Sequence, residues 1–358
     1  MSRFKNRKAN VPKARIQDYI WTIYGRPKAG KTTLFHKLIQ KAFGDSSKGQ
    51  LLAFEKGYQA LSGVFAEDVP NWKEFISIVD DLIALRADER EEAKKAGVEF
   101  EPSIEFIGID TVDEMWVMAT EYALLLKSRE DGKRYKTISD IPWGGGYDLV
   151  AKTVDTQIKR LQRAGYGLWF ITHDKDKKFE SRDGVSYDKT TVNLQNRARD
   201  LIINMSDFII FIDIAKEQIG DELVDTRYIY FRGDGELEAG SRFENIESRI
   251  PYNVDLFYDV FEKAVLNSVG SGVDIQKLRE EQAAVREAEA EAYLEQEQEQ
   301  ASLDDLRDLI TEAINSLNPS AKDQVKAKFK ELIGTVNYKK EDLTAKQLQD
   351  CLDFVRSL

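Results

Sequence analysis

Residues 23–38 read IYGRPKAGKTTLFHKL, and this stretch decides the fold. Gly25 and Gly30 bracket four residues, and Lys31 and Thr32 follow directly. The apolar run before the first glycine predicts a buried strand, and the segment after the second glycine predicts a helix. A turn of this kind between a strand and a helix fits the P-loop pattern G-x-x-x-x-G-K-[ST].

The chemistry of this pattern is the binding of nucleotide phosphates. Glycines let successive backbone N–H groups turn inward, and the helix N-terminus adds unpaired N–H groups and the positive end of its dipole. We expect Lys31 to reach the β- and γ-phosphates of ATP and the hydroxyl of Thr32 to coordinate Mg²⁺. The alternative is an ordinary glycine turn at a helix start. The predicted nucleotide-binding residues are Gly25, Ala29, Gly30, Lys31, Thr32 and Thr33.

Two acidic residues follow buried strands. Asp110 ends the apolar run IEFIGID (104–110), the position of an acid that holds Mg²⁺ opposite a P-loop. Its alternative role is to cap the next helix. Glu55 ends the strand GQLLAFE (49–55), and strand carboxyl ends converge on the ligand in open α/β sheets. We expect Glu55 to activate water, unless it is a plain surface glutamate.

The chain has two histidines, and His173 directly follows the predicted strand GLWFIT (167–172). From that strand end, His173 can reach a γ-phosphate and couple nucleotide state to the loop behind it. The alternative is a histidine that only satisfies local hydrogen bonds. His36 has no evident task in the predicted phosphate-binding helix.

Bulk composition limits the classes of function. The 358 residues carry a formal net charge of −11, so nucleic-acid binding over the whole surface is excluded and must rely on local patches. A single cysteine, Cys351, allows no disulfide within the chain and suggests a reducing compartment. We find neither a membrane span nor a secretory signal, and predict a cytoplasmic protein with no membrane partner.

The order of predicted elements indicates an α/β fold. Strands and helices alternate over residues 16–240, which implies a mostly parallel sheet. The last two strands, at 207–214 and 226–231, are predicted to form an antiparallel edge hairpin. We predict a basic N-terminal arm, an ATPase core, an acidic helical linker and a small three-helix C-terminal domain. Their ranges are 1–15, 16–270, 271–301 and 302–358.

The linker prediction depends on composition. Eight glutamates and one arginine lie between residues 280 and 299, and no apolar face repeats along that segment. We therefore expect a solvated helix, with a partner-binding tail as the alternative.

The motifs GRPKAGKTT, LLAFEKG, IEFIGID and FITH together resemble the RecA-like branch of P-loop ATPases. The stretch ARIQDYIWTIYGRPKAGKTTL (14–34) looks most like phage-encoded AAA-family ATPases of the Sak single-strand-annealing type. The resemblance covers roughly residues 14–250. It implies a catalytic glutamate on the strand after the P-loop helix, which corresponds to Glu55. It also implies two mobile loops that bind single-stranded DNA, here at 127–146 and 174–192.

Both of these predicted loops carry cations, and the first adds an aromatic ring. Cations can follow the phosphates of a single strand while a ring stacks on a base. Nearby acids keep the net charge modest, so binding should be weak and salt-sensitive, and plain solvated loops remain the alternative. The candidate DNA-binding residues are Lys133, Arg134, Trp143, Lys175, Lys177 and Lys178.

The resemblance further implies a homo-oligomer that hydrolyses ATP at subunit interfaces with a cation donated in trans. Arg232 and Arg242 are the candidates for that cation, and ordinary surface arginines are the alternative. The short N-terminal arm makes independent strand exchange doubtful, because no separate polymerisation domain precedes the core.

The sequence thus predicts an Mg²⁺-dependent ATPase that binds single-stranded DNA in phage recombination or replication. A single-strand-binding protein or another replication protein is the expected partner. The main alternative is a nucleotide-gated loader or adaptor for a replication protein such as a helicase. A small-molecule kinase is a further alternative, although no acceptor-binding pattern stands out.

Overall fold

The computed structural model divides the chain into two compact units, which meet between Glu289 and Ala290. Unit 1 holds the residues before that point and unit 2 the residues after it. Part of the predicted N-terminal arm, residues 1–8, lies outside the described residues. The described residues are 9–180, 183–184, 186–219, 222–270, 272–317 and 319–358.

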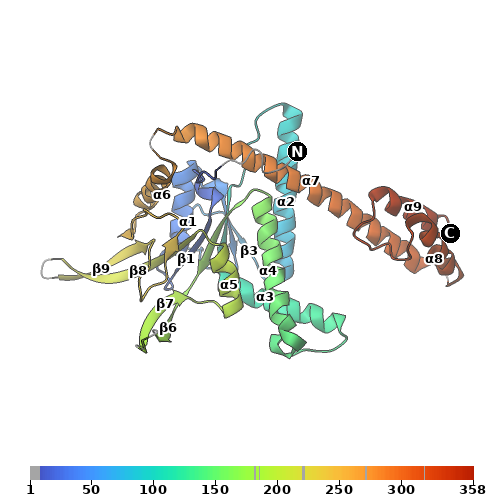
Figure 1. Ribbon diagram of the computed structural model, residues 1–358, viewed down its shortest axis with the longest axis horizontal. Coiled ribbons are helices and arrows are strands. Elements are labelled where there is room, and N and C mark those ends of the chain that lie inside the picture. Colours follow the sequence, from blue (N-terminus) through green and yellow to red (C-terminus); the bar gives the residue numbers. More distant parts are fainter. Residues whose placement is uncertain (1–8, 181–182, 185, 220–221, 271, 318) are drawn as a thin grey trace. The chain divides into compact units, whose positions relative to one another are not determined.

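A central sheet forms the middle of unit 1 (Figure 1). Its main path, in spatial order, is β11 (Arg249–Pro251), β9 (Glu222–Tyr230), β8 (Phe208–Ile219), β1 (Ile20–Gly25), β5 (Gly167–Thr172), β4 (Phe106–Asp110), β2 (Gly49–Ala53) and β3 (Ala66–Asp68). The strands from β8 to β3 run parallel, while β9 is antiparallel to β8. A two-residue strand, β10 (Gly240–Ser241), pairs with the start of β8. The predicted α/β fold with an antiparallel hairpin is confirmed.

Helices cover both faces of this sheet. On one face, α1 (Lys31–Phe43) packs beside α6 (Val254–Val269). The other face carries α2 (Trp72–Ala96), α3 (Val112–Glu130), α4 (Gly145–Arg163) and α5 (Asn196–Met205). Four short 3₁₀ helices connect these elements: η1 (Ile16–Asp18), η2 (Ser46–Lys48), η3 (Ile138–Asp140) and η4 (Pro142–Gly144).

Large aromatic rings fill the core between the sheet and the α1–α6 layer. Trp21, Trp169 and Phe208 come from three neighbouring strands and are fully buried. The rings of Trp21 and Phe208 stack with centroids 3.8 Å apart. Burial of such side chains, at roughly 25 cal/mol per Å² of apolar surface, fixes which face of each strand meets the helices.

Helix α2 is capped at its start by Asn71. The Asn71 side chain accepts hydrogen bonds from the backbone N–H groups of Lys73 and Glu74 at 3.0 and 3.1 Å. At the other end Gly97 adopts a positive φ of 66° and ends the helix. Asn71 at the start and Gly97 at the end therefore set the length of this 25-residue helix.

The prediction of a second mobile loop at 174–192 is wrong, because the described part of these residues forms a β-hairpin. Strand β6 (Asp174–Glu180) pairs with β7 (Ser186–Val192). The polar composition hid this ribbon, yet its side chains match across the strands. Thr190 donates a hydrogen bond to Asp176 at 2.8 Å, and the rings of Phe179 and Tyr187 stack with centroids 6.1 Å apart.

The first predicted loop is shorter than expected. Helix α3 continues to Glu130 instead of ending near residue 126, and α4 begins at Gly145. Two 3₁₀ turns, η3 and η4, occupy the segment between them. Tyr135 orders this segment, because its hydroxyl donates to Asp131 at 2.8 Å and its ring is buried.

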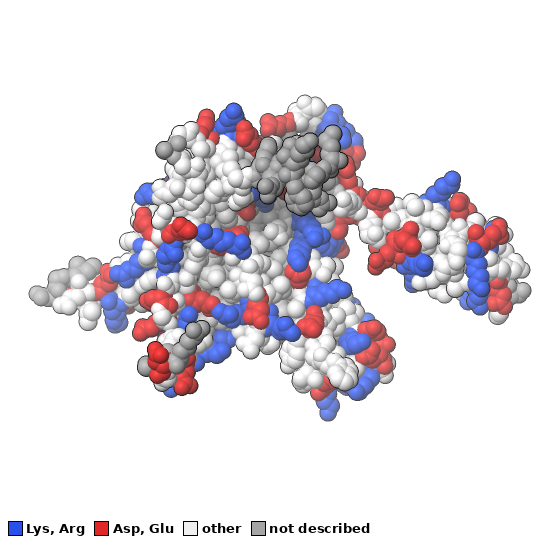
Figure 2. Space-filling view, viewed as in Figure 1, with Lys and Arg blue, Asp and Glu red and all other residues white. Residues whose placement is uncertain are grey.

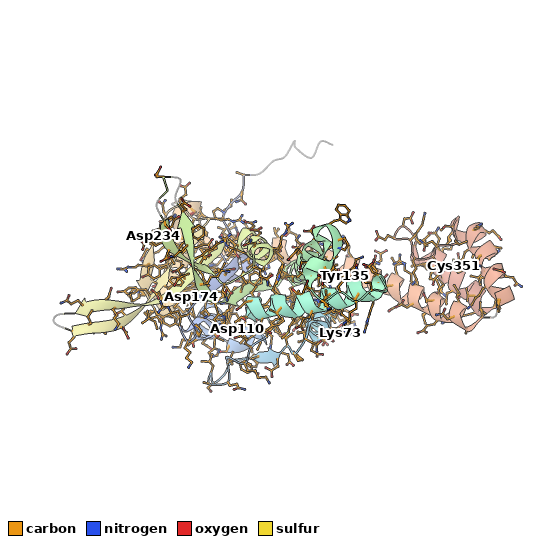
Figure 3. The ribbon with its side chains drawn as sticks, turned by 90° about the horizontal axis from the view of Figure 1, so that it is seen from below. Lys73, Asp110, Tyr135, Asp174, Asp234 and Cys351 are labelled. Carbon is orange, nitrogen blue, oxygen red and sulfur yellow. The ribbon has the colours of Figure 1, made fainter. Side chains whose placement is uncertain are left out.

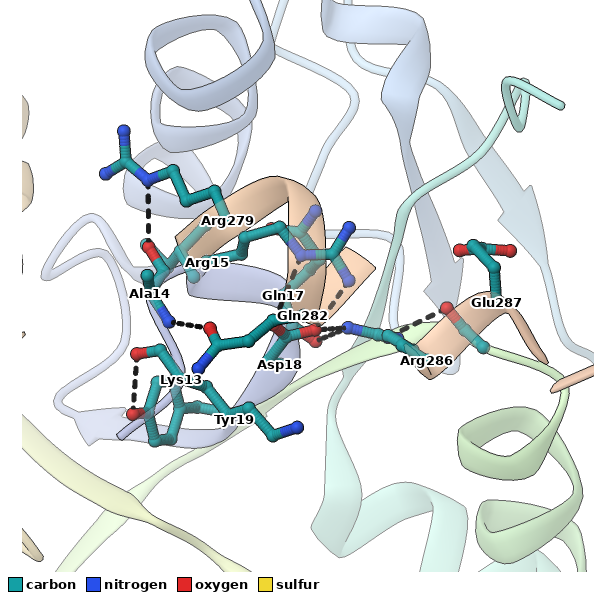
Figure 4. Close-up of polar contacts among 12 residues, drawn as sticks. Lys13, Ala14, Arg15, Gln17, Asp18, Tyr19, Arg279, Gln282, Arg286 and Glu287 are labelled. Atoms are coloured by element: carbon teal, nitrogen blue, oxygen red, sulfur yellow. Dashed lines mark hydrogen bonds and ion pairs between the residues drawn. The ribbon is translucent and has the colours of Figure 1, made fainter. Parts of the chain in front are cut away.

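The predicted linker over 271–301 is not a separate segment. One helix, α7 (Ile275–Ser316), runs without a break through this stretch and into the first helix predicted for the C-terminal domain. Its first half packs on the core of unit 1. Gln282 is 8% exposed and accepts a hydrogen bond from the backbone N–H of Ala14 at 2.7 Å (Figure 4). The segment is helical as predicted, but one face of residues 275–289 packs on unit 1, so the helix is solvated only on its other face.

Arg286 supplies the strongest part of this contact. Its guanidinium donates to the carbonyl oxygens of Gln17 and Gly165, both at 2.7 Å, and pairs with Asp18 (Figure 4). The contacts with α7 also hold the last residues of the predicted arm, 12–15, in place. Ala14 is buried, and its carbonyl accepts from Arg279 at 3.1 Å.

Unit 2 has its own small core. It contains the second half of α7 with α8 (Pro319–Ile333) and α9 (Ala345–Arg356). Buried side chains from these helices pack together, among them Ile310, Phe329, Leu352 and the free Cys351 (Figure 3). In the described part of the chain, no helix is long and apolar enough to cross a membrane.

Candidate functional site

The site lies at the carboxyl edge of the parallel strands, where β1, β2, β4 and β5 all end. The phosphate loop joins β1 to α1, so its backbone sits at the centre of this edge. Lys31 is 6% exposed and donates from Nζ to the carbonyl oxygens of Gly25 and Arg26 at 2.7 and 3.0 Å. Burial lowers the pKa of Lys31, against the opposing attraction of Asp110. A buried ammonium held only by carbonyls is suited to bind phosphate.

Gly25 and Gly30 shape the loop. They adopt φ values of 150° and 100°, in the region that favours glycine. A Cβ atom on Gly25 would lie 2.3 Å from the backbone oxygen of Ile212. The backbone of the loop is therefore packed directly against strand β8.

Thr32 and Asp110 meet across the edge. The hydroxyl of Thr32 donates to Oδ2 of Asp110 at 2.6 Å. Burial raises the pKa of this carboxyl, and the Thr32 hydrogen bond and the Lys31 charge oppose the shift. A hydroxyl and a carboxylate oxygen are the hard ligands that Mg²⁺ prefers. The two side chains thus fit the metal-binding role predicted for them.

Glu55 and His173 also reach this edge. Oε1 of Glu55 accepts from the hydroxyl of Thr111 at 3.3 Å. Nδ1 of His173 lies 3.0 Å from Oδ2 of Asp113, at the start of α3. One potential ligand atom from each of Glu55, Asp113 and His173 lies within 4.8 Å of the others. The peptide bond between Asp110 and Thr111, beside this cluster, is cis.

The contact between Asp113 and His173 favours the charged form of both side chains, a carboxylate and an imidazolium. The hydrogen bond from Asp113 raises the pKa of His173, while burial and Lys31 act against this rise. Burial would raise the pKa of Asp113, but the hydrogen bonds from His173 and Thr111 hold it below its usual value. No role at the site was predicted for Asp113 from the sequence. Its position three residues after Asp110 was the available signal.

The family of the chain follows from a comparison with known proteins. A family model described as an AAA domain matches residues 17–243, more than half of the chain. This chain belongs to the AAA domain family. The match supports nucleotide binding by a P-loop ATPase core, and it spans every strand-end residue described above. No curated protein matches the chain.

The fold of unit 1 also brings Tyr252 and Arg227 to the phosphate loop, although sequence reasoning missed both. Tyr252 precedes α6, and its hydroxyl donates to the carbonyl of Gly30 at 2.7 Å. The guanidinium of Arg227, on β9, lies 5.0 Å from the centre of the Tyr252 ring. Burial raises the pKa of Tyr252 to about 12, so its hydroxyl remains a donor at neutral pH. No local motif marks either residue, because only the folding of β9 against β8 and β11 brings them here.

The candidate DNA-binding residues of the AAA domain occupy two places. Lys175, Lys177 and Lys178 lie on β6, which begins directly after His173. Figure 3 labels Asp174, the first residue of β6, and Asp110, the last residue of β4; both belong to unit 1. Lys175 donates to the carbonyl of Leu194 at 2.8 Å. This first place follows the nucleotide edge directly in the sequence, because β6 begins one residue after His173.

The second place is the α3–α4 connection, with Lys133, Arg134 and Trp143. Trp143 is 101% exposed and has a φ of 61°, a conformation that side chains other than glycine rarely adopt. Lys133 lies 5.0 Å from the Tyr135 ring. Basic and acidic side chains alternate over the face in Figure 2, so any nucleic-acid contact rests on such local groups.

Arg232 and Arg242 both make contacts within the AAA domain. Arg232 donates to the carbonyl oxygens of Phe243 and Glu244. Arg242 pairs with Asp207 at 3.1 Å, and its side chain is 66% exposed. Both lie near the amino end of β8, opposite the edge that carries the phosphate loop. Neither can act on the nucleotide of its own subunit.

Proposed function

We propose that this protein is a RecA-like, Mg²⁺-dependent ATPase whose turnover is coupled to single-stranded DNA. The observation that carries the proposal is the convergence of Lys31, Thr32, Asp110, Glu55 and His173 on one sheet edge, with a basic β-hairpin directly behind His173. A phosphate loop alone is consistent with many nucleotide enzymes. The attached hairpin favours an ATPase that passes its nucleotide state to a ligand.

Each residue has a separate part in the proposed reaction. Lys31 leaves the carbonyls of Gly25 and Arg26 and binds phosphate oxygens. Thr32 and Asp110 would hold Mg²⁺, and a bound ion would supply positive charge against the phosphate oxygens. Glu55 orients the attacking water and accepts its proton. His173, held by Asp113, contacts the phosphate end and passes its presence to β6.

The proposed DNA surface consists of Lys175, Lys177 and Lys178 on the hairpin, with Lys133, Arg134 and Trp143 at the α3–α4 connection. Cations follow the phosphates and the exposed indole stacks on a base. With so few cations, binding should be weak, and it should fall as salt rises with a slope set by the small number of phosphates that they neutralise.

We further propose that hydrolysis occurs in a homo-oligomer. Arg242 is the better candidate for the cation donated in trans, since its side chain is exposed whereas Arg232 is bonded to two carbonyls. The resemblance of residues 14–34 to phage annealing ATPases supports the proposal of an activity in phage recombination or replication, and we propose a single-strand-binding protein as the partner.

Steady-state ATP hydrolysis with Mg²⁺, with and without single-stranded DNA, tests this proposal. We expect DNA to stimulate turnover, and Glu55→Gln to lower kcat about 10²- to 10⁴-fold with ATP affinity retained. Turnover that is indifferent to DNA would reject the coupling to a single strand. Unchanged turnover in Glu55→Gln would remove Glu55 from the catalytic role.

A further inference from the structure

A cleft of about 230 Å³ lies beside the nucleotide edge, and no motif in the sequence points to it. It opens between α3, the hairpin and the segment that joins β7 to α5. Its lining residues are Asp113, Trp116, Val117, Lys175, Asn193, Leu194, Gln195 and Ala198. The cleft therefore shares Asp113 with the candidate catalytic cluster and Lys175 with the proposed DNA surface.

One part of the lining is apolar and fixed. Trp116 is 4% exposed and Leu194 is 3% exposed, so their positions are set by the core around them. The Trp116 and Leu194 side chains therefore give the cleft a rigid apolar wall, against which a planar ring can pack. The volume is smaller than the roughly 300–1,000 Å³ of clefts that hold whole drug-sized ligands. The cleft accordingly suits one planar ring system rather than an entire nucleotide.

The rest of the lining offers side-chain amides that can form hydrogen bonds with a ligand. Asn193 and Gln195 are exposed, and within the described residues neither side-chain amide has a hydrogen-bond partner. Each amide offers two N–H donors and one carbonyl acceptor, which match the edge of an unstacked nucleobase. Lys175 carries a cation at the same cleft, and Lys177 follows it on β6. Cations beside a ring-sized cleft suit the phosphates that flank a base.

We propose that this cleft binds one unstacked base of a DNA single strand, whose phosphates lie along the lysines of β6. The inference rests on the proposed function, because it assumes that single-stranded DNA is a ligand. It also suggests how binding of a base can affect the nucleotide site. Asp113 both lines the cleft and holds His173, with its Oδ2 3.0 Å from Nδ1. A base amino group in the cleft competes for this carboxylate and so changes how His173 is held.

The first experiment compares two labelled oligonucleotides of equal length by fluorescence anisotropy, one an ordinary single strand and the other abasic throughout. Both carry the same phosphates, so only the bases differ. We expect wild-type protein to bind the ordinary strand roughly tenfold more tightly, the effect of about one stacked base. Equal binding of both strands would overturn the cleft proposal and the stacking of Trp143 on a base, while the proposed DNA-coupled ATPase, bound through phosphates, would stand. Binding of neither strand would overturn the proposed function itself, and the inference with it.

The second experiment locates the preference. The double variant Asn193→Ala with Gln195→Ala removes both amides from the cleft while changing no buried side chain. We expect it to lose most of the preference for the ordinary strand and to bind the abasic strand as wild type does. Gln162→Ala, an exposed glutamine on α4 outside the cleft, is the matched control and should keep the preference. A double variant that keeps the full wild-type preference for the ordinary strand would remove base binding from this cleft.

Discussion

Asp113 and His173 show how a single contact sets the charge of a site residue. The pKa of His173 is raised by the Asp113 hydrogen bond, and burial, Lys31 and Glu55 also act on it. Because the folded-state pKa exceeds the unfolded value, the pair stabilises the fold fully below the unfolded pKa of about 6.5. That contribution is lost as the pH rises through the folded-state pKa.

We predict that Asp113→Asn lowers the pKa of His173 and removes this pH-dependent stabilisation. NMR titration of the imidazole resonances measures the pKa, and His36 is the internal control because it lies in α1 without contact to Asp113. Denaturation above about pH 5, where Asp113 stays ionised, isolates the histidine contribution. An unchanged His173 titration in Asp113→Asn would show that the carboxylate does not hold the charge.

The residues of the site were accessible from sequence to different degrees. Asp110, Glu55 and His173 each end or closely follow an apolar strand, so their shared edge follows from the geometry of parallel strands. Asp113 depended on the distance between α3 and β5, which no single segment encodes. Tyr252 reaches the phosphate loop across 222 residues of sequence, so its role there needs the folded chain.

The helices and strands also differed in how well the sequence predicted them: elements with a local sequence signal were predicted, and the hairpin that depends on pairing between strands was not. Strand β5 was predicted to the residue, because an apolar run is a local signal. The β6–β7 hairpin was not, since its alternating lysines and aspartates resemble a solvated loop. Its stability comes from pairing across the ribbon and from bonds to a distant segment, such as the Thr190 N–H donating to Glu236 at 2.8 Å.

The turn between β1 and α1 permits a sharp test of its backbone. We predict that Gly25→Ala lowers the free energy of unfolding by at least about 1–3 kcal/mol. The added Cβ would meet the backbone oxygen of Ile212, which cannot move without distorting β8. Gly57→Ala is the matched control, since nothing lies within 4 Å of its Cβ.

Tryptophan fluorescence during urea denaturation measures this loss for unit 1 alone, because the five tryptophans all lie at or before residue 169. Equal stability of the two glycine variants would mean that the loop tolerates a side chain at residue 25. The tight packing of the phosphate loop on β8 would then have no energetic importance.

At the scale of the whole molecule, the boundary between the units changes how the C-terminal part should be removed. Composition suggests a cut near residue 274, where the acidic stretch begins. The structure shows instead that residues 275–289 belong to unit 1, because Arg279, Gln282 and Arg286 hold the segment around Ala14. A cut at 274 would remove these contacts and confuse loss of stability with loss of function.

We predict that a chain ending at Glu289 keeps the unfolding midpoint of the tryptophan signal, whereas one ending at Val273 is less stable by about 3 kcal/mol or more. The shorter chain loses the hydrogen bonds of Arg286 and leaves the carbonyl oxygens of Gln17 and Gly165 and the buried Asp18 with fewer partners. Urea denaturation of the two chains measures the difference. Equal midpoints would mean that the first half of α7 does not stabilise unit 1.

The chain ending at Glu289 then separates the two functional hypotheses. Unit 2 has its own buried core, which is what a partner-binding module of a loader or adaptor needs. If unit 1 alone couples nucleotide to DNA, DNA-stimulated ATP turnover should survive the removal of residues 290–358. If the protein is a loader, the truncated chain should keep nucleotide binding while it loses its replication partner and the stimulation that this partner supplies. Since the truncation leaves every strand-end residue and both hairpins intact, loss of DNA stimulation in a stably folded chain ending at Glu289 would favour the loader.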